Sequence, residues 1–356
     1  MPERHVVWMD ESRAVEARSV GGKFANLAKL ESAGVRVPPG FAVSTSAFRL
    51  FVDKLRGSIE PSLKGLDFQE VESTETVSRM IGDVIMRSNI PREVEKSVRR
   101  AYQELGRRTG SYSGSVPVAV RSSATAEDLA EASLAGQHET YLWVKGEDQV
   151  LNYVKECWAS LFSARSLKYR HVHRIDSFEV DMGVVIQRMV NSTSSGVMFT
   201  LNPTNGDLSK ISIESSWGLG EAIVGGLVTP DSFTVDKVTL EILEKRASRK
   251  LKKIIAVNDQ IQEVEVPNDR QDVLSLNDEE VTELSKLGKS IETMYRSPQD
   301  IEWAIDASLK FPENVFILQA RPETVWANKM SESLGKSGET LDLMIDKLIR
   351  GQKMEE

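Results

Sequence analysis

The residues whose types and spacing could do chemistry lie in three segments that are far apart in the sequence. In the first, an apolar, β-type run from Val118 ends at Arg121 and gives way to small hydroxyl residues that include Thr125. A guanidinium held at the end of a strand offers a fixed fork of donors, which suits a polyphosphate. The same composition also fits a structural role, in which Ser or Thr caps a helix that begins near Glu127. Phosphate binding by Arg121 and Thr125 is therefore predicted, with helix capping as the alternative.

The second segment places Lys23 directly after Gly21 and Gly22, at the start of a helix-like pattern of apolar residues. A glycine turn that leads into a helix presents backbone N–H groups and, in this case, an ammonium to an anion. Taken alone, the segment favours an ordinary helix start with a solvated lysine. A phosphate contact becomes the better interpretation only if other segments of the chain also indicate a nucleotide site.

The third segment pairs two strand-like runs, DIEWAID at 300–306 and FILQARPETV at 316–325, joined by a proline turn. Alternate strand residues share a face, so Gln319 and Arg321 point the same way and lie beside Glu302 on one sheet. Oxygen ligands next to a guanidinium suit Mg²⁺ and a polyphosphate. A buried Glu–Arg pair that only ties two strands together would leave the same pattern, and both interpretations stay open on these residues alone.

With two further segments, these runs resemble the N-terminal nucleotide-binding domain shared by phosphoenolpyruvate synthase and pyruvate phosphate dikinase. The segment around Lys23 is SVGGKFANLAKLESAGVRVPPGFAVSTSAF at 19–48, and the further segments are SSGVMFTLNP at 194–203 and IESSWGLGEAIVGGLVTPDSFTVDK at 213–237. All segments come in the family's order, and together they cover residues 19–326. The resemblance implies an α+β chain with the ATP-grasp fold, in which two to three lobes hold the nucleotide in the cleft between them.

The resemblance also divides the chain into three parts. Residues 1–190 would form the N-terminal part of the ATP-grasp domain, with the phosphate loops and a lid. Residues 191–326 would form the C-terminal part, with the metal and phosphate site. Residues 327–356 would be a helical tail or a partner-docking segment, since apolar residues recur there at helical spacing.

Roles for single residues follow from the same resemblance. Lys23, Arg121 and Arg321 are the expected catalytic residues, which clamp the phosphates and stabilise the charge of the transition state. The adenine is expected against the segment from Gln187 to Val190, with Gln187, Met189 and Val190 as its contacts. Glu221 is expected at the ribose or the metal, unless it only caps a helix. ATP and Mg²⁺ are the expected cofactors. The expected metal ligands are Glu302 and Gln319, with Asp300 in support.

Two other nucleotide-binding patterns fail on inspection. In WGLGEAIVGG, Ile223 stands where the third glycine of a dinucleotide fingerprint is required. The tripeptide GKS occurs at 288–290 and again at 335–337, but Glu283 and Met330 replace the upstream glycine of a P-loop. A nucleotide must therefore be held in some other way.

Composition limits the class of protein. The chain has 356 residues, a net charge of −8 and a pI near 5.4, which argues against a general nucleic-acid binder. The single cysteine, Cys157, excludes an intrachain disulfide and suits a reducing compartment. The N-terminal segment has no signal-peptide core, and no later segment approaches eighteen apolar residues. A cytoplasmic protein that binds no membrane is expected.

Periodicity predicts the elements that position these residues. Residues 49–110 and 148–169 read as helical, and 278–296 as a helix capped by Asn277 or Asp278. Residues 182–190 read as a buried strand, and SSGVMFTLNP as a Ser-Ser-Gly turn followed by a strand. The stretch 239–275 reads as a peripheral hairpin or a flexible insertion.

In the resembled family, the β-phosphoryl group of ATP passes to a histidine on a separate domain, giving AMP, and then to an acceptor in a TIM barrel. None of the four histidines lies in the family's carrier context. A partner subunit that carries the phosphocarrier histidine and the acceptor-binding domain is therefore expected. The acceptor would be pyruvate, as in phosphoenolpyruvate synthase, or phenol, as in phenylphosphate synthases with a small subunit of this kind. The alternatives are a rifamycin phosphotransferase-like system, a non-catalytic ATP sensor or scaffold, and a self-sufficient kinase that makes ADP.

Overall fold

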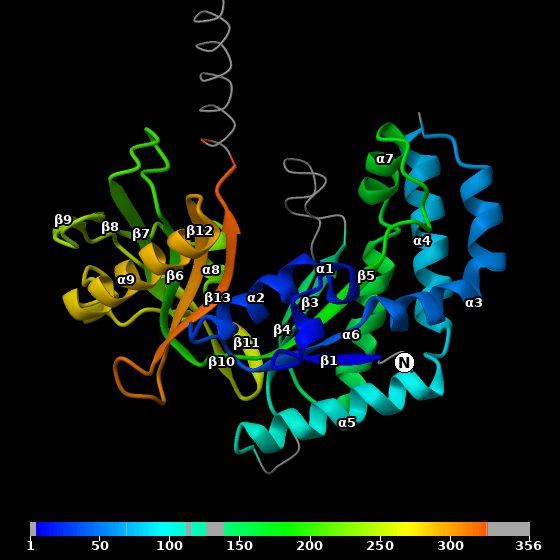
Figure 1. Ribbon diagram of the computed structural model, residues 1–356, viewed down its shortest axis with the longest axis horizontal. Coiled ribbons are helices and arrows are strands. Elements are labelled where there is room, and N and C mark those ends of the chain that lie inside the picture. The colour runs from blue at the N-terminus through cyan, green and yellow to red at the C-terminus, as the bar shows by residue number, and fades with distance from the viewer. Residues whose placement is uncertain (1–4, 69, 112–114, 126–138, 325, 327–356) are drawn as a thin grey trace, which may run out of the picture.

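The structure, a computed structural model, describes residues 5–68, 70–111, 115–125, 139–324 and 326 (Figure 1). The mixture of helices and strands that the sequence predicts is confirmed. The predicted helix near Glu127 and the predicted tail at 327–356 lie outside the described residues. None of the described helices is both long enough and apolar enough to cross a membrane.

The first half of the chain forms a five-stranded antiparallel sheet, the five-strand sheet, in the order β1-β2-β5-β3-β4. Its strands are β1 (Val6–Trp8), β2 (Gly40–Val43), β3 (Val118–Ala124), β4 (Thr140–Val144) and β5 (Met182–Arg188). Strands β3 and β5 are central, and nearly every residue in them is buried. Apolar runs rich in β-branched residues, such as VAV and VVI, suit a strand that is covered on both faces. The strand predicted at 182–190 is confirmed.

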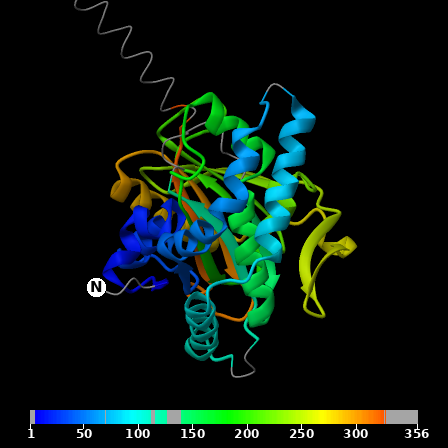
Figure 2. The same ribbon diagram turned by 90° about the vertical axis from the view of Figure 1, so that its right-hand side faces the viewer.

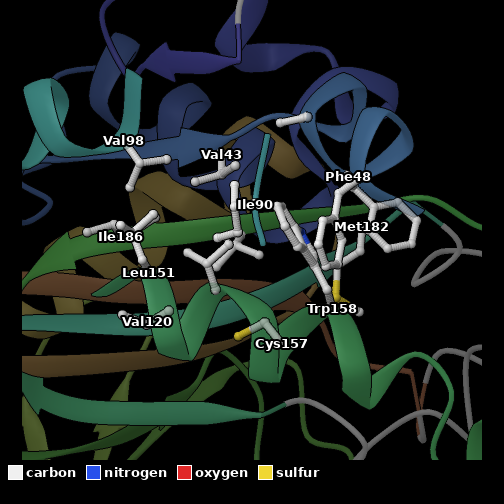
Figure 3. Close-up of a cluster of buried hydrophobic side chains, with 14 of the residues drawn as sticks. Val43, Phe48, Ile90, Val98, Val120, Leu151, Cys157, Trp158, Met182 and Ile186 are labelled. Carbon is white, nitrogen blue, oxygen red and sulfur yellow. The ribbon is translucent and has the colours of Figure 1, made fainter. Parts of the chain in front are cut away.

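A layer of helices covers one face of this sheet (Figure 1). Its members are α3 (Thr45–Lys64), α4 (Val71–Arg87), α5 (Arg92–Arg108), α6 (Glu147–Ser160) and α7 (Ala164–Val172). Figure 3 shows the core between them, where Trp158 and Cys157 of α6 belong to one buried cluster with Val120 of β3 and Ile186 of β5. The Cys157 side chain is fully buried, and this burial raises the pKa of its thiol.

The second half forms a six-stranded antiparallel sheet, the six-strand sheet, in the order β13-β12-β6-β7-β8-β9. Its strands are β6 (Ser192–Phe199), β7 (Lys210–Trp217), β8 (Asp231–Asp236), β9 (Ile242–Arg246), β12 (Gln299–Asp306) and β13 (Val315–Pro322). Helix α9 (Asp278–Tyr295) packs on one face, and Asn277 and Glu280 form a capping box at its start. The helix and the β12–β13 pair agree with the prediction.

The Ser-Ser-Gly turn predicted within SSGVMFTLNP is wrong, because Ser194, Ser195 and Gly196 lie inside β6. Gly196 is required by the neighbouring strands rather than by a turn. A Cβ atom at this position would stand 1.8 Å from the carbonyl oxygen of Glu214 on β7 and 2.7 Å from the ring of Trp303 on β12.

Helix α2 (Gly22–Ser32) lies between the two sheets and joins their cores (Figure 1). It follows two short turns, η1 (Ser12–Val15) and α1 (Ala17–Val20). Its apolar face, with Phe24 and Leu27, belongs to a buried cluster that includes Val185 of β5 and Ile317 of β13. The chain crosses from one sheet to the other at 189–191, yet the two halves share this core.

The approach of α2 to β3 depends on Gly21. Its φ is +81°, and a Cβ atom there would stand 2.0 Å from the carbonyl oxygen of Ser123. Both the backbone conformation and the contact exclude a side chain. Gly21, the first glycine of the pair before Lys23, therefore allows the start of α2 to contact the end of β3.

Replacing Gly21 by alanine should lower the free energy of unfolding by roughly 3 kcal/mol, from left-handed strain plus overpacking. Gly34 is the matched control, because its φ is +82° but nothing lies within 4 Å of an added Cβ. Gly34→Ala should cost only the strain, about 1–2 kcal/mol. Urea denaturation of both variants measures the difference, and equal losses would contradict the close approach.

A two-stranded hairpin, β10 (Lys252–Val257) and β11 (Gln260–Glu265), projects from the six-strand sheet and appears in yellow in Figure 2. A buried ion pair fixes its base, since Lys250 Nζ lies 2.5 Å from Asp231 Oδ1 and both side chains are fully buried. The other oxygen of Asp231 accepts hydrogen bonds from the backbone N–H and the hydroxyl of Ser275. The short turn η3 (Asn268–Arg270) follows the hairpin.

Candidate functional site

A cavity of about 310 Å³ is lined by strands of both sheets and by the short helix α8 (Glu221–Val224). It brings together seven of the residues that the sequence predicted for the site. These are Arg121, Gln187, Met189, Val190, Glu221, Glu302 and Gln319. The other four predicted residues, Lys23, Thr125, Asp300 and Arg321, do not line the cavity.

The five-strand sheet supplies Arg121. Along β3 the side chains of Val118 and Val120 enter the core of the helical layer, so Ala119 and Arg121 face the other way and line the cavity. The Nε atom of Arg121 is buried and has no hydrogen-bond partner among the described residues. An unsatisfied buried donor is costly, which makes this guanidinium a candidate to bind an anionic ligand.

Lys23 does not line the cavity, but its ammonium group contacts the residue that follows Arg121. It is the second residue of α2, and its Nζ donates to the carbonyl oxygen of Ser122, 3.1 Å away. Thr125 has a structural role in this arrangement. Its hydroxyl donates to the carbonyl oxygen of Asp181 at 3.2 Å, which ties the end of β3 to the start of β5.

The segment that leaves β5 forms the side of the cavity at the crossing between the sheets. The backbone N–H groups of Arg188 and Met189 donate to the carbonyl oxygens of Pro39 and Pro117. The N–H of Val190 is the first in this segment without a hydrogen-bond partner among the described residues, and Val190 lines the cavity. The side-chain amide of Gln187 is buried and donates to Pro38, so this residue fixes the strand.

The six-strand sheet supplies Glu302 and Gln319, which are directly opposite each other on β12 and β13. The register then shifts, so that Leu318 has no partner on β12. Such a bulge re-aims side chains, and both Leu318 and Gln319 line the cavity as a result. An apolar surface and an amide oxygen thus stand side by side.

Asp300 and Arg321 continue the row of Glu302 and Gln319 toward the end of the strands. Both Nε and one terminal nitrogen of Arg321 lie 2.8 Å from Asp300 Oδ2. Burial raises the pKa of the Asp300 carboxyl, against the opposing effect of the Arg321 guanidinium, and the charge of Glu302 raises it further. The Glu–Arg pairing considered from the sequence is therefore an Asp300–Arg321 pair, which leaves Glu302 to the cavity.

Glu221 is the first residue of α8, but Gly220 occupies the N-cap and no side chain of the described residues caps the helix, so the capping interpretation of Glu221 is wrong. The backbone before it is held by the hairpin, because Leu219 N–H donates to the carbonyl oxygen of Ile254 at 2.8 Å. The turn of the hairpin reaches the other wall, where Lys145 Nζ lies 2.6 Å from Asp259 Oδ1. Lys145 directly follows β4, which contributes Thr140 and Leu142 to the cavity. The hairpin therefore contacts segments on both sides of the cavity, although none of its described residues lines it.

Arg188 lines the cavity as well. It belongs to the segment from Gln187 to Val190 that the sequence analysis expects at the adenine, and it is the single charged residue in the strand predicted at 182–190. Leu318 and Val224 were missed. They are ordinary apolar residues in the sequence, and only the bulge in β13 and the exposed end of α8 place them here.

The oxygen donors of the six-strand sheet fit Mg²⁺. Among the residues that the structure describes, no group of three or more His, Cys, Asp or Glu side chains could hold a metal without other ligands. Magnesium in nucleotide sites is commonly held by one or two carboxylates together with substrate phosphates and water. Glu302 and Asp300 with the amide oxygen of Gln319 form a donor set of that kind.

Comparison with known proteins agrees with this geometry. Residues 17–340 match the AMP/ATP-binding domain of pyruvate phosphate dikinase. The chain is 42% identical to a probable phosphoenolpyruvate synthase of Staphylothermus marinus, over 97% of this chain and 44% of the relative. It is 44% identical to the phosphoenolpyruvate synthase of Aeropyrum pernix, over 95% of this chain and 44% of the relative. The chain therefore spans less than half the length of these relatives.

Proposed function

Since this chain belongs to the AMP/ATP-binding domain family of pyruvate phosphate dikinase, we propose that its two sheets form an ATP-grasp fold whose cavity holds ATP for phosphoryl transfer. Residues 1–190 and 191–326 would be the two parts of this fold. The observation that carries the proposal is the composition of one cavity. An apolar end at the crossing segment and a polar end with Arg121, Glu302 and Gln319 match the two ends of a nucleotide.

At the apolar end, Val190 would donate its backbone N–H to the adenine edge, while Leu318 and Val197 cover the ring. Gln187 would act indirectly, because its amide holds β5 to the Pro38 segment. Glu221, at the start of α8, would accept a hydrogen bond from the ribose. Preformed positions of this kind orient the nucleotide with little loss of conformational freedom.

At the polar end, Arg121 would bind the phosphates directly, and Lys23 and Arg321 would approach them from the adjoining ends of α2 and β13. Glu302 and Gln319, with Asp300, would hold Mg²⁺, which would neutralise phosphate charge and orient the oxygens. Thr125 would act by holding β3 to β5. In phosphoryl transfer, positioned cations supply most of the rate, and this set of residues provides them without a general base.

The receiving group is proposed to lie on a partner subunit. In this reaction the bond between the α- and β-phosphates of ATP would break, so that AMP leaves as the β-phosphoryl group passes to a histidine of that subunit. Water would take the γ-phosphoryl group as phosphate, and the phosphohistidine would then transfer its phosphoryl group to pyruvate or phenol. The names of the relatives support a phosphoenolpyruvate synthase-like reaction, and their greater length leaves room for carrier and acceptor parts outside the matched region.

The decisive experiment mixes the protein with Mg-ATP, with and without carrier subunits, and analyses nucleotides and phosphohistidine. AMP and phosphohistidine should appear only when the carrier is present, and pyruvate or phenol should then discharge it. Release of ADP without a carrier would contradict the proposal. Binding of ATP without any product under all conditions would instead indicate an ATP sensor or scaffold.

A further inference from the structure

Arg188 and Asp306 form an ion pair at the place where the chain crosses between the sheets. Arg188 is the last residue of β5 and Asp306 is the last of β12. One terminal nitrogen of Arg188 lies 3.4 Å from Asp306 Oδ2. The pair therefore links the five-strand sheet to the six-strand sheet beside the crossing segment 189–191.

The surroundings of Asp306 fix its orientation. Its side chain is only 1% exposed. One carboxylate oxygen accepts hydrogen bonds from the backbone N–H of Ser308, at 2.8 Å, and from the Ser308 hydroxyl. The other oxygen is directed to Arg188. A buried carboxylate without a cation would be strongly unfavourable, so this arrangement holds the guanidinium in one place.

Arg188 is among the residues that line the cavity, and its Nε atom is buried without a hydrogen-bond partner in the part of the chain that the structure describes. Its terminal group also lies 5.5 Å from the centre of the Phe316 ring, in an apolar cluster with Val190. Since an unsatisfied buried donor costs free energy, a ligand that offers an acceptor at Nε would be favoured.

The position of Arg188 separates it from the phosphate end. Arg188 lies opposite Val118 on β3, whereas Arg121 lies three residues further along the same strand. At about 3.3 Å per residue, this places the two cations roughly 10 Å apart along the sheet. That spacing suits one cation at the nucleoside and the other at the phosphates.

We propose that Asp306 is a positioning residue that holds Arg188 against the nucleoside part of the bound nucleotide, where the guanidinium donates to a nitrogen or oxygen acceptor of the base or ribose. This inference rests on the proposed ATP site and adds a residue that recognises the nucleoside rather than the phosphates. The ion pair also ties nucleoside binding to the relative position of the two sheets, because its members belong to different sheets.

Calorimetric titration of the full chain with adenosine, AMP and ATP tests the proposal. Arg188→Met should weaken binding of all three by a similar factor, roughly tenfold or more, because the lost contact is common to them. Arg121→Met should weaken ATP much more than adenosine. Asp306→Asn should weaken binding several-fold when Arg188 is present and should have no further effect on binding in the Arg188→Met background.

Arg108 and Asp10 provide the matched control. They form an ion pair with the same 3.4 Å separation, and Arg108 also lies over an aromatic ring, that of Trp8, but neither residue lines the cavity. Arg108→Met and Asp10→Asn should leave nucleotide affinity unchanged. If Arg188→Met does not fold, Arg188→Lys keeps a cation for Asp306 but loses the planar fork, and should show the same uniform weakening to a smaller degree.

Two results would overturn the inference. One is unchanged adenosine affinity in both Arg188 variants. The other is an Asp306→Asn effect on binding that is the same with and without Arg188. Both differ from failure of the proposed function, in which the unsubstituted chain would not bind ATP at all.

Discussion

Replacing Glu302 by glutamine should reduce phosphoryl transfer by about 10²- to 10³-fold, the usual effect of removing one group that stabilises developing charge. Glutamine keeps the size of the side chain and the partnership with Gln319 across the strands, but it removes the charge that would hold Mg²⁺. Turnover is measured as AMP formed with the carrier subunit present. ATP binding without Mg²⁺ should change little, which separates metal binding from nucleotide binding.

Glu214→Gln is the control for this prediction. Glu214 lies on β7 opposite Val197, which is itself opposite Glu302, so the two glutamates belong to one row of the six-strand sheet. Glu214 is half-buried, which raises the pKa of its carboxyl, but it does not line the cavity. Its variant should retain full turnover. Equal losses in the two variants would mean that the charge of the sheet matters and that Glu302 has no special role.

Replacing Lys250 by methionine should lower the free energy of unfolding by about 3–5 kcal/mol, because it leaves the buried Asp231 carboxylate without a cation. The double variant Lys250→Met/Asp231→Asn should recover part of the loss, since the uncompensated charge is gone. Urea denaturation measures both values.

The control for the buried pair lies on the hairpin itself. Lys252 and Glu263 form an ion pair across β10 and β11, with side chains 50% and 45% exposed. Lys252→Met should cost no more than about 1 kcal/mol, as is usual for exposed pairs. A cost for Lys250→Met as small as this would show that solvent reaches Asp231. A large cost would also predict weaker ATP binding, because the hairpin holds the backbone of Leu219 at the cavity wall.

The sequence predicted the strands of the site better than it predicted their contacts. Glu302 and Gln319 were expected to be neighbours because two apolar runs flank a proline turn, and the register confirms the pairing. Arg121 was expected at the end of a strand, and this was wrong, because β3 continues to Ala124, but Arg121 does line the same cavity. The local pattern carries this information, since alternation along a strand decides which side chains share a face. Whether these residues bind ATP and Mg²⁺ remains a prediction.

Other features depend on contacts between distant segments. The bulge at Leu318 arises from the register of two strands, and nothing in FILQARPE marks it. Gly196 suggested a turn, whereas crowding by β7 and β12 places it inside a strand. Arg188 lay in the segment expected at the adenine, but its pairing with Asp306, 118 positions later, could not be predicted from the sequence. Tertiary packing determines the structure at these residues, and the local sequence pattern does not contain that information.

Because the thiol of Cys157 is buried, dyes can be attached to cysteines introduced elsewhere in the protein. A thiol whose pKa is raised by burial reacts slowly with maleimides, since the thiolate is the reactive form. Cysteines introduced at Val172 and Val238, which are 70% and 77% exposed, would therefore take fluorescent dyes while the native cysteine stays unlabelled. Energy transfer between dyes on α7 and on the six-strand side would then report, in solution, whether ATP brings the two halves of the protein closer together.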